Sequence, residues 1–154
     1  MENLQAAIKT AFASEFAFYL KAHNFHWNVE GYDFQQMHDL FGDIYEEVYG
    51  TIDDFAENIR KTGAYAPGSL ARFSILSEIP GEDQQLDCLE MAKELLQDSD
   101  KMAELFKLVY KMAEEAGEYG LANYFADRQD AHRKHSWKLR ATTKPEPAEP
   151  GEMS

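Results

Sequence analysis

Three histidines and two carboxylates within residues 23–57 are the side chains of this sequence best suited to chemistry. Imidazole and carboxylate groups are the ligands that iron, zinc and manganese take in proteins. They lie on segments that otherwise read as apolar helix, where polar groups are costly to bury unless they are paired or bind a metal. A metal site is therefore the leading hypothesis, and a purely structural role of these groups is the alternative.

The spacing of these residues decides whether one chain can close such a site. Asp53 and Glu57 are four residues apart and would share one helix face. His38 lies fifteen residues before Asp53 on what reads as the same helix, a distance of about 22 Å. His26 lies on the preceding helix, and an antiparallel return would bring it near His38. A two-fold axis across this helix pair would join the histidine end of one chain to the carboxylate end of another, so we expect a site shared between chains.

Four long helices are expected to position these groups. Apolar residues recur at helical spacing in residues 3–28, 34–62, 84–116 and 121–141. The first helix is apolar on two sides, which indicates that a neighbouring subunit covers one of them. At the start of the second helix, Asp33 and Gln36 have the spacing of a capping box.

The segment that joins the second and third helices, residues 62–83, is long and rich in Pro, Gly and Ser. Within it, Leu70, Phe73 and Leu76 are three residues apart and predict a short helix between two Pro-Gly pairs. A crossover of this length lets helices two and three run parallel. The predicted fold is therefore all-α, a ferritin-like four-helix bundle with a short extra helix in the long crossover between helices two and three.

The overall composition limits the classes of function. The 154 residues carry a net charge of −13, which disfavours unaided binding to nucleic acid or to an anionic membrane. The single cysteine, Cys88, excludes an internal disulfide and reads as a packing residue. Neither a signal-peptide core nor a membrane-spanning run is found, so we expect a cytoplasmic protein. Residues 1–142 are expected to form one domain, and the acidic, proline-rich residues 143–154 a disordered tail.

A metal site in the middle of the bundle is not expected. Ferritin-like di-iron proteins carry a Glu-x-x-His motif on each of two helices, and this sequence contains no such motif. His132 and His135, on the fourth helix, are interpreted as half-buried histidines that are hydrogen-bonded within the fold. The missing motif also favours a metal site at a subunit interface.

One set of residues in this region resembles the signature of the Dps family, the starvation-associated miniferritins. The matching residues are His26-Trp27-Asn28-Val29-x-Gly31, then Phe34, His38 and Tyr45, then Asp53-x-x-Ala56-Glu57-x-Ile59. The similarity continues through the short crossover helix to Trp137, so it covers nearly the whole chain apart from the tail. It implies a four-helix subunit assembled as a hollow shell of twelve.

The resemblance also implies a function, the oxidation of Fe(II) by hydrogen peroxide or oxygen and storage of the ferric mineral inside the shell. His26 and His38 of one subunit and Asp53 and Glu57 of its two-fold partner would hold non-haem iron, with zinc as a substitute metal. Trp27 would lie next to these ligands, close enough to intercept radicals or to pack against a ligand.

This sequence departs from the family at Gly42, where the family commonly has an acidic residue four positions after the second histidine. The departure places the bridging or second-iron ligand in question, and His23, one turn before His26, is the candidate substitute. A packing or surface role is the alternative for His23.

Further acidic residues match other family features. Glu118 and Asp127 fall in the region of the acidic three-fold entry pores, and Asn123 stands at a position that is often acidic. Asp39 and Asp43, four residues apart, could nucleate mineral on the inner wall. A solvated helix face is the alternative for each of these groups.

Two other functions compete with ferroxidation. The first is a nucleoid protector whose main role is DNA compaction. In the family that role generally relies on basic, flexible termini, which this chain lacks, so DNA binding is not expected. The second is a cage that binds metal without turnover because Gly42 leaves the site one ligand short.

Overall fold

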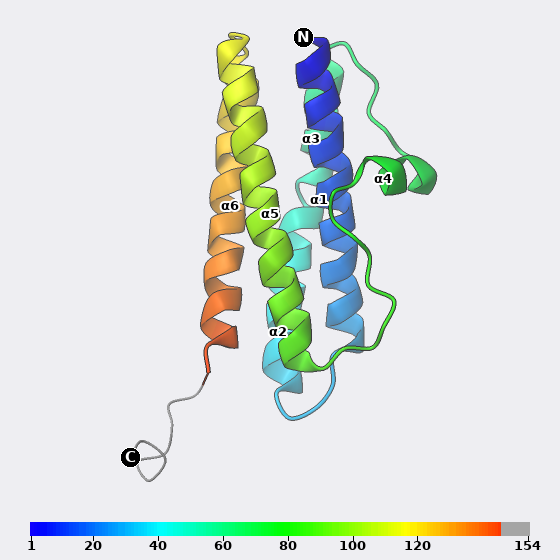
Figure 1. Ribbon diagram of the computed structural model, residues 1–154, viewed down its shortest axis with the longest axis vertical. Coiled ribbons are helices and arrows are strands. Elements are labelled where there is room, and N and C mark those ends of the chain that lie inside the picture. The colour runs from blue at the N-terminus through cyan, green and yellow to red at the C-terminus, as the bar shows by residue number, and fades with distance from the viewer. Residues whose placement is uncertain (146–154) are drawn as a thin grey trace.

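Four long helical runs lie side by side along one axis (Figure 1). The computed structural model describes residues 1–145, and in that range it contains helices and no strands. The helices are α1 (Glu2–Asn28), α2 (Phe34–Tyr49), α3 (Ile52–Lys61), α4 (Leu70–Leu76), α5 (Cys88–Glu115) and α6 (Tyr119–Thr143). Helix α6 ends at Thr143, and residues 146–154 of the expected tail lie outside the described range.

The order and direction of the helices confirm the predicted topology. Helices α2 and α3 return antiparallel to α1, and the crossover then carries the chain back along the outside of α1, so that α5 runs parallel to α2 and α3 (Figure 1). Helix α4 lies within this crossover, beside α1. The fold is therefore the ferritin-like bundle with a short helix in the crossover that the sequence predicts.

The second long helix is interrupted at Gly50 and Thr51, whereas the sequence predicts one unbroken helix up to residue 62. The Thr51 backbone N–H bonds to the Val48 carbonyl at 3.0 Å, three residues back, and the Thr51 hydroxyl donates to the same carbonyl at 2.8 Å. This tightens the last turn of α2 in the manner of a 3₁₀ turn. The hydroxyl of Tyr124 on α6 donates to the Thr51 carbonyl at 3.2 Å and ties the junction to the bundle.

The predicted capping box at Asp33 is not formed. Asp33 does precede α2, but its φ of −100° and ψ of 25° are outside the extended region that a capping residue needs, and its side chain caps no N–H group. A complete capping box instead opens α5, where the Asp87 carboxylate accepts from the Glu90 N–H at 2.8 Å and the Glu90 carboxylate accepts from the Asp87 N–H at 3.2 Å.

An aromatic cluster packs between four helices of the bundle. Phe55 on α3 has no exposed surface, and its ring contacts Phe12 at 5.1 Å, Phe125 at 5.6 Å and Phe106 at 5.9 Å between centroids. These four rings come from four different helices, and edge-to-face contacts of this kind add to the gain from burial. Within residues 1–145, no helix is long and apolar enough to cross a membrane.

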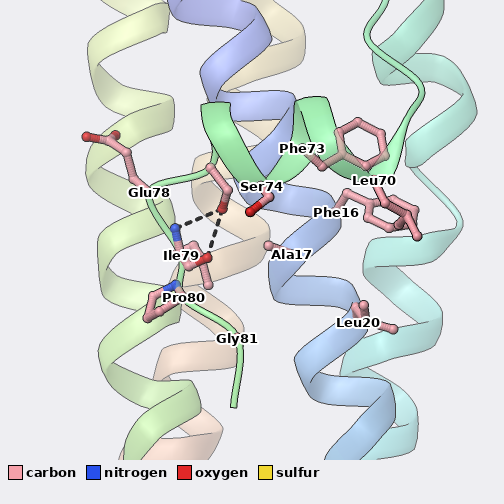
Figure 2. A pocket seen from close by; sticks show the side chains of 11 residues that line it. Phe16, Ala17, Leu20, Leu70, Phe73, Ser74, Glu78, Ile79, Pro80 and Gly81 are labelled. Atoms are coloured by element: carbon pink, nitrogen blue, oxygen red, sulfur yellow. Dashed lines mark hydrogen bonds between the residues drawn. The ribbon is translucent and has the colours of Figure 1, made fainter. Parts of the chain in front are cut away.

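One apolar face of the first helix lies outside this core, as the two-sided pattern predicts. Phe16 stacks on Phe73 of α4 at 4.6 Å between centroids, and Leu20 remains 43% exposed. Between α1 and the segment from α4 to Gly81 lies a pocket of about 580 Å³, with Phe16 and Leu20 on one side and Leu70 and Phe73 on the other (Figure 2). The chain therefore presents an apolar surface beside α4 that no other part of the described chain covers.

Replacing Phe55 by alanine tests the contribution of the aromatic cluster. Phe55→Ala should lower the free energy of unfolding by about 3–5 kcal/mol, because the lost contacts leave a cavity between four helices. The measurement is urea unfolding followed by helical circular dichroism. Tyr32→Ala, at a fully exposed position, is the control and should change the unfolding midpoint little. Equal effects of the two substitutions would show that the cluster does not stabilise the bundle.

Candidate metal site

His26 near the end of α1 and His38 in the first turns of α2 form a reciprocal pair. His26 Nδ1 lies 2.7 Å from the His38 carbonyl oxygen, and His38 Nδ1 lies 2.7 Å from the His26 carbonyl oxygen. The two rings stack at 3.8 Å between centroids with an interplanar angle of 19°. The sequence prediction that the antiparallel turn brings these two histidines together is confirmed.

This geometry sets the tautomer of both rings. A carbonyl oxygen only accepts hydrogen bonds, so each Nδ1 carries the proton, and in the neutral ring each Nε2 keeps its lone pair. Such a bond from one ring nitrogen to a carbonyl is the usual support of a metal-binding histidine, because it fixes the ring and raises the basicity of the other nitrogen. Each histidine here supplies that support to the other.

Gly42 leaves free the space against α2 that the His26 ring occupies. A Cβ atom at position 42 would lie 3.1 Å from both Cε1 and Nδ1 of His26, which is closer than ordinary van der Waals contact. The His26 ring therefore lies directly on the bare backbone of α2. The departure at this position has a physical consequence, since any side chain here would press on the His26 ring, which one hydrogen bond and the stacked His38 ring hold in place.

His23 lies between aromatic rings beside this pair. Its ring stacks on Tyr45 at 3.8 Å and contacts Trp27 at 4.0 Å between centroids, and its Nδ1 lies 2.9 Å from the Tyr19 hydroxyl. Burial, together with the nearby His26, lowers the pKa of His23 and favours the neutral ring. His23 is 6.1 Å from His26 between ring centroids. Its role as a metal ligand stays a prediction. Its ring packs between aromatic side chains, which is the alternative that the sequence left open.

Asp53 and Glu57 lie on α3, away from the histidines. Both are exposed, and neither forms an ion pair within residues 1–145. Helix α3 lies toward the opposite end of the bundle from the turn between α1 and α2 (Figure 1). Within the same residues, no group of three or more His, Cys, Asp or Glu side chains could hold a metal ion. One chain thus brings the two histidines together and leaves the two carboxylates far from them.

The acidic residues expected at pores and at nucleation sites are mostly on the surface. Asp39, Asp43 and Asp127 are exposed, and Asp39 accepts a hydrogen bond from Gln35 at 3.1 Å. Glu118 is half-buried just before α6, where its side chain caps no N–H group. These positions agree with solvated helix faces, and the pore and nucleation roles stay predictions.

Comparison with known proteins supplies the family. The protein-family model of the ferritin-like domain matches residues 5–145 of this chain. The chain is 31% identical over 130 residues to the DNA protection during starvation protein of Helicobacter pylori, across 84% of this chain and 90% of that one. It is 32% identical over 127 residues to the protein of the same name from Brevibacillus brevis, across 80% and 83%. The chain belongs to the Dps family of ferritin-like proteins.

Solved structures agree with this assignment. The crystal structure of a Dps protein from Bacillus brevis superposes with a TM-score of 0.89 at 26% identity, covering 93% of this chain and 96% of that one. Dps from Thermosynechococcus elongatus, at 24% identity, shares the fold with a TM-score of 0.90, covering 99% and 96%. The fold of this Dps-type chain is thus that of a miniferritin subunit.

The sequence interpretation missed a charged cluster inside this Dps-type bundle. His132 is fully buried and its Nε2 lies 2.7 Å from Glu15 Oε1, while Nε2 of the nearly buried His135 lies 2.7 Å from Glu47 Oε1. Arg128 donates to Glu15 at 3.0 Å and to Glu47 at 2.6 and 3.2 Å. The two histidines are hydrogen-bonded as expected, but they are buried rather than half-buried. The signal was present, because Glu15 and Arg128 interrupt apolar stripes at helical spacing.

Gly42→Ala tests the packing of the histidine pair. The added Cβ should shift the His26 ring and lower the affinity for Zn(II), used as a probe, by about tenfold, the lower end of the range for disturbed support of a ligand. Isothermal titration measures the change. Gly120→Ala in α6, where a Cβ meets no atom within 4 Å, is the matched control and should bind as the native protein does. Unchanged affinity in Gly42→Ala would remove the pair from metal binding.

Proposed function

We propose that this protein is a ferroxidase miniferritin. It oxidises Fe(II) with hydrogen peroxide or oxygen at sites shared between two-fold-related subunits, and it stores the ferric mineral in a shell of twelve. Iron is the substrate and cargo, and zinc is a substitute metal. The observation that carries the proposal is the reciprocal bond pair of His26 and His38, which leaves two Nε2 lone pairs available at one end of the bundle.

The position of the carboxylates supports a shared site. Asp53 and Glu57 are exposed and form no ion pair in the described part of the chain. Both carboxylates are therefore accessible to a metal ion bound by the histidines of a partner subunit. Two carboxylates offset the charge of the ion, while two imidazoles supply nitrogen donors suited to Fe(II) and leave coordination positions open for the oxidant. Trp27, which is 57% exposed beside His23, lies where it could intercept a radical formed at the site.

The apolar surface beside α4 supports the assembly. Leu70 and Ile75 are 75% and 73% exposed in the single chain, next to the pocket that Phe16 and Leu20 line. Exposed apolar surface of this kind marks a protein–protein contact. We infer that a homo-oligomer buries this surface and, across a two-fold axis, pairs the histidine end of one subunit with the carboxylate end of another. A cytoplasmic location, typical of the family, stays a prediction.

Gly42 favours one alternative, a cage that binds metal without rapid turnover. The family's usual acidic residue is absent there, and the His26 ring lies against the position that it would occupy. Fe(II) oxidation followed by stopped-flow absorbance separates the two functions, because a cage that only binds iron gives no fast ferric signal.

Co-assembly of two inactive variants tests the sharing of the site. His26→Ala and Glu57→Ala should each abolish rapid Fe(II) oxidation, since each removes one ligand from every site. When the two variants are unfolded, mixed equally and reassembled, random pairing leaves about one quarter of the shared sites with all ligands intact. The mixed shells should therefore recover about a quarter of the native rate.

The control is each variant unfolded and reassembled alone, which should recover nothing. An intrachain site would also recover nothing on mixing, because every chain lacks one ligand. Fast oxidation by either single variant would remove that residue from the mechanism.

DNA binding is expected to be absent at physiological salt. The relatives named for DNA protection do not transfer that role to this chain, because its net charge of −13 repels a phosphate backbone and no basic run offsets it. A gel-shift titration of plasmid DNA with metal-free protein should show no retardation from low to physiological salt. Retardation that weakens as salt rises would reveal a basic surface formed by the assembly.

A further inference from the structure

The buried cluster contains the ligand types of a transition-metal site, although no group of three or more such side chains in residues 1–145 could hold a metal ion as the chain stands. Two carboxylates and two imidazoles, from Glu15, Glu47, His132 and His135, converge from α1, α2 and α6. The two histidines are three residues apart, so they project from the same face of α6. Ferritin-like di-iron proteins hold metal with glutamates and histidines that project inward from facing helices. The donor types here are the same, although no Glu-x-x-His motif supplies them.

The cluster also lies midway along the long axis of the bundle. Glu15 is the middle residue of α1, and Glu47 lies midway along the run formed by α2 and α3. Arg128 and His132 are on either side of the middle of α6. The cluster is therefore at the centre of the bundle, far from the turn that carries His26 and His38, and it is a separate site.

The guanidinium of Arg128 lies between the two carboxylates of this cluster. Its Nη2 lies 3.0 Å from Glu15 Oε2 and 3.2 Å from Glu47 Oε1, so one nitrogen bridges the two carboxylates. Its Nη1 lies 2.6 Å from the other oxygen of Glu47. The Arg128 side chain is 5% exposed, that of Glu15 is fully buried and that of Glu47 is 37% exposed. The guanidinium thus occupies the position from which a bound cation would contact both acids.

Arg128 is the permanent positive charge beside these carboxylates. Two ionised carboxylates carry two negative charges, and among residues 1–145 Arg128 is the one Lys or Arg side chain that contacts them. Rings of Phe18 and Phe106 lie 4.8 and 5.7 Å from the His132 ring between centroids, so the surroundings are apolar. Without the guanidinium, the two carboxylates would lose their one Lys or Arg partner in the described chain, and buried Glu15 would keep only its bond to His132 unless another cation entered.

We propose that the Arg128 guanidinium occupies the cation position of a potential metal site at the centre of the bundle. Removing this guanidinium opens the site to one divalent transition-metal ion within a single chain. In the native protein the guanidinium closes the site, because its N–H groups occupy the carboxylate lone pairs and its charge repels a second cation. Transition metals are thereby kept out of the bundle, whatever chemistry takes place at the histidine pair.

The ligands would have to close on the vacated position to bind a metal. Zinc binds carboxylate oxygen and imidazole nitrogen at about 2.0–2.2 Å, compared with 2.6–3.2 Å for the present contacts of Arg128. The His132 ring is held in place, since its Nδ1 lies 3.2 Å from the Ser99 hydroxyl on α5 and its Nε2 lies 2.7 Å from Glu15 Oε1. The ring protons that now bond to the carboxylates would leave as the metal enters, as is usual for imidazole ligands.

The test measures Co(II) binding in a background without the histidine pair. The parent variant carries His26→Ala and His38→Ala, so that any nitrogen-ligated Co(II) is bound elsewhere. Addition of Arg128→Ala to this parent should produce the strong visible absorption of four- or five-coordinate Co(II), with about one ion per chain retained after gel filtration. The parent itself should show neither. The readout is binding, so the result does not depend on ferroxidase activity.

Three matched variants in the same background test the assignment. Arg128→Lys keeps the positive charge and should bind no Co(II). Arg133→Ala removes an arginine from the exposed side of α6 and should also bind none. Adding His132→Leu to Arg128→Ala should abolish the new absorption. Co(II) retained in any of these three would overturn the proposal.

A variant that loses its fold is informative as well. If Arg128→Ala is unfolded without metal, Zn(II) should restore its helical circular dichroism, since binding energy then becomes folding energy. An unfolded Arg128→Ala protein that Zn(II) does not refold would overturn the proposal, as would a folded one that binds no Co(II).

Discussion

The rise of an α-helix, about 1.5 Å per residue, is the constraint on which the rest of this molecule depends. His38 and Asp53 are on the same helical run, so no packing of that run against its neighbours brings them to one ion. The antiparallel return of α2 solves half of the problem, because it places His38 against His26. In the proposed shared site, the other half would come from a second chain. Function at that site would then require assembly of the subunits, for which the apolar surface beside α4 is the candidate contact.

The cluster around Arg128 sets a second condition, on pH. Burial alone would raise the pKa of Glu47, but the hydrogen bonds from His135 and Arg128 and the charge of Arg128 outweigh it and lower the pKa to about 2. Burial opposes ionisation of Glu15 too, and the charges of His132 and Arg128 hold its pKa below the usual 4.5. Groups with lowered pKa values stabilise the fold above their unfolded pKa and lose that contribution as the pH falls. Burial also lowers the pKa of His135. This shift likewise reduces the stability of the fold as the pH falls below about 6.5, the usual pKa of histidine.

The sequence predicted the parts of this structure that periodicity and local spacing control. Helical stripes gave the four long helices and the crossover helix, and the turn before α2 gave the histidine pair. It did not predict the break at Thr51, because that break depends on a side-chain bond to Val48 and on Tyr124 from α6. Nor did it predict the charged cluster, because partners up to 117 residues apart meet only after the bundle has formed.

The proposed metal site and the cluster around Arg128 differ in how a cation is supplied to imidazole and carboxylate groups. At the turn between α1 and α2, the backbone carbonyls hold the Nδ1 protons of both imidazoles, and within residues 1–145 neither Nε2 has a hydrogen-bond partner, as the proposed metal site requires. At the bundle centre, the imidazole Nε2 atoms are bonded to carboxylates, and the cation is covalently part of the chain. A fixed guanidinium needs no equilibrium with solvent and stabilises the core at any metal concentration, whereas open imidazoles are useful only where metal must enter and leave. The same ligand types can therefore serve a proposed metal site or a structural cluster, and in this chain the hydrogen-bond partner of each Nε2 distinguishes the two.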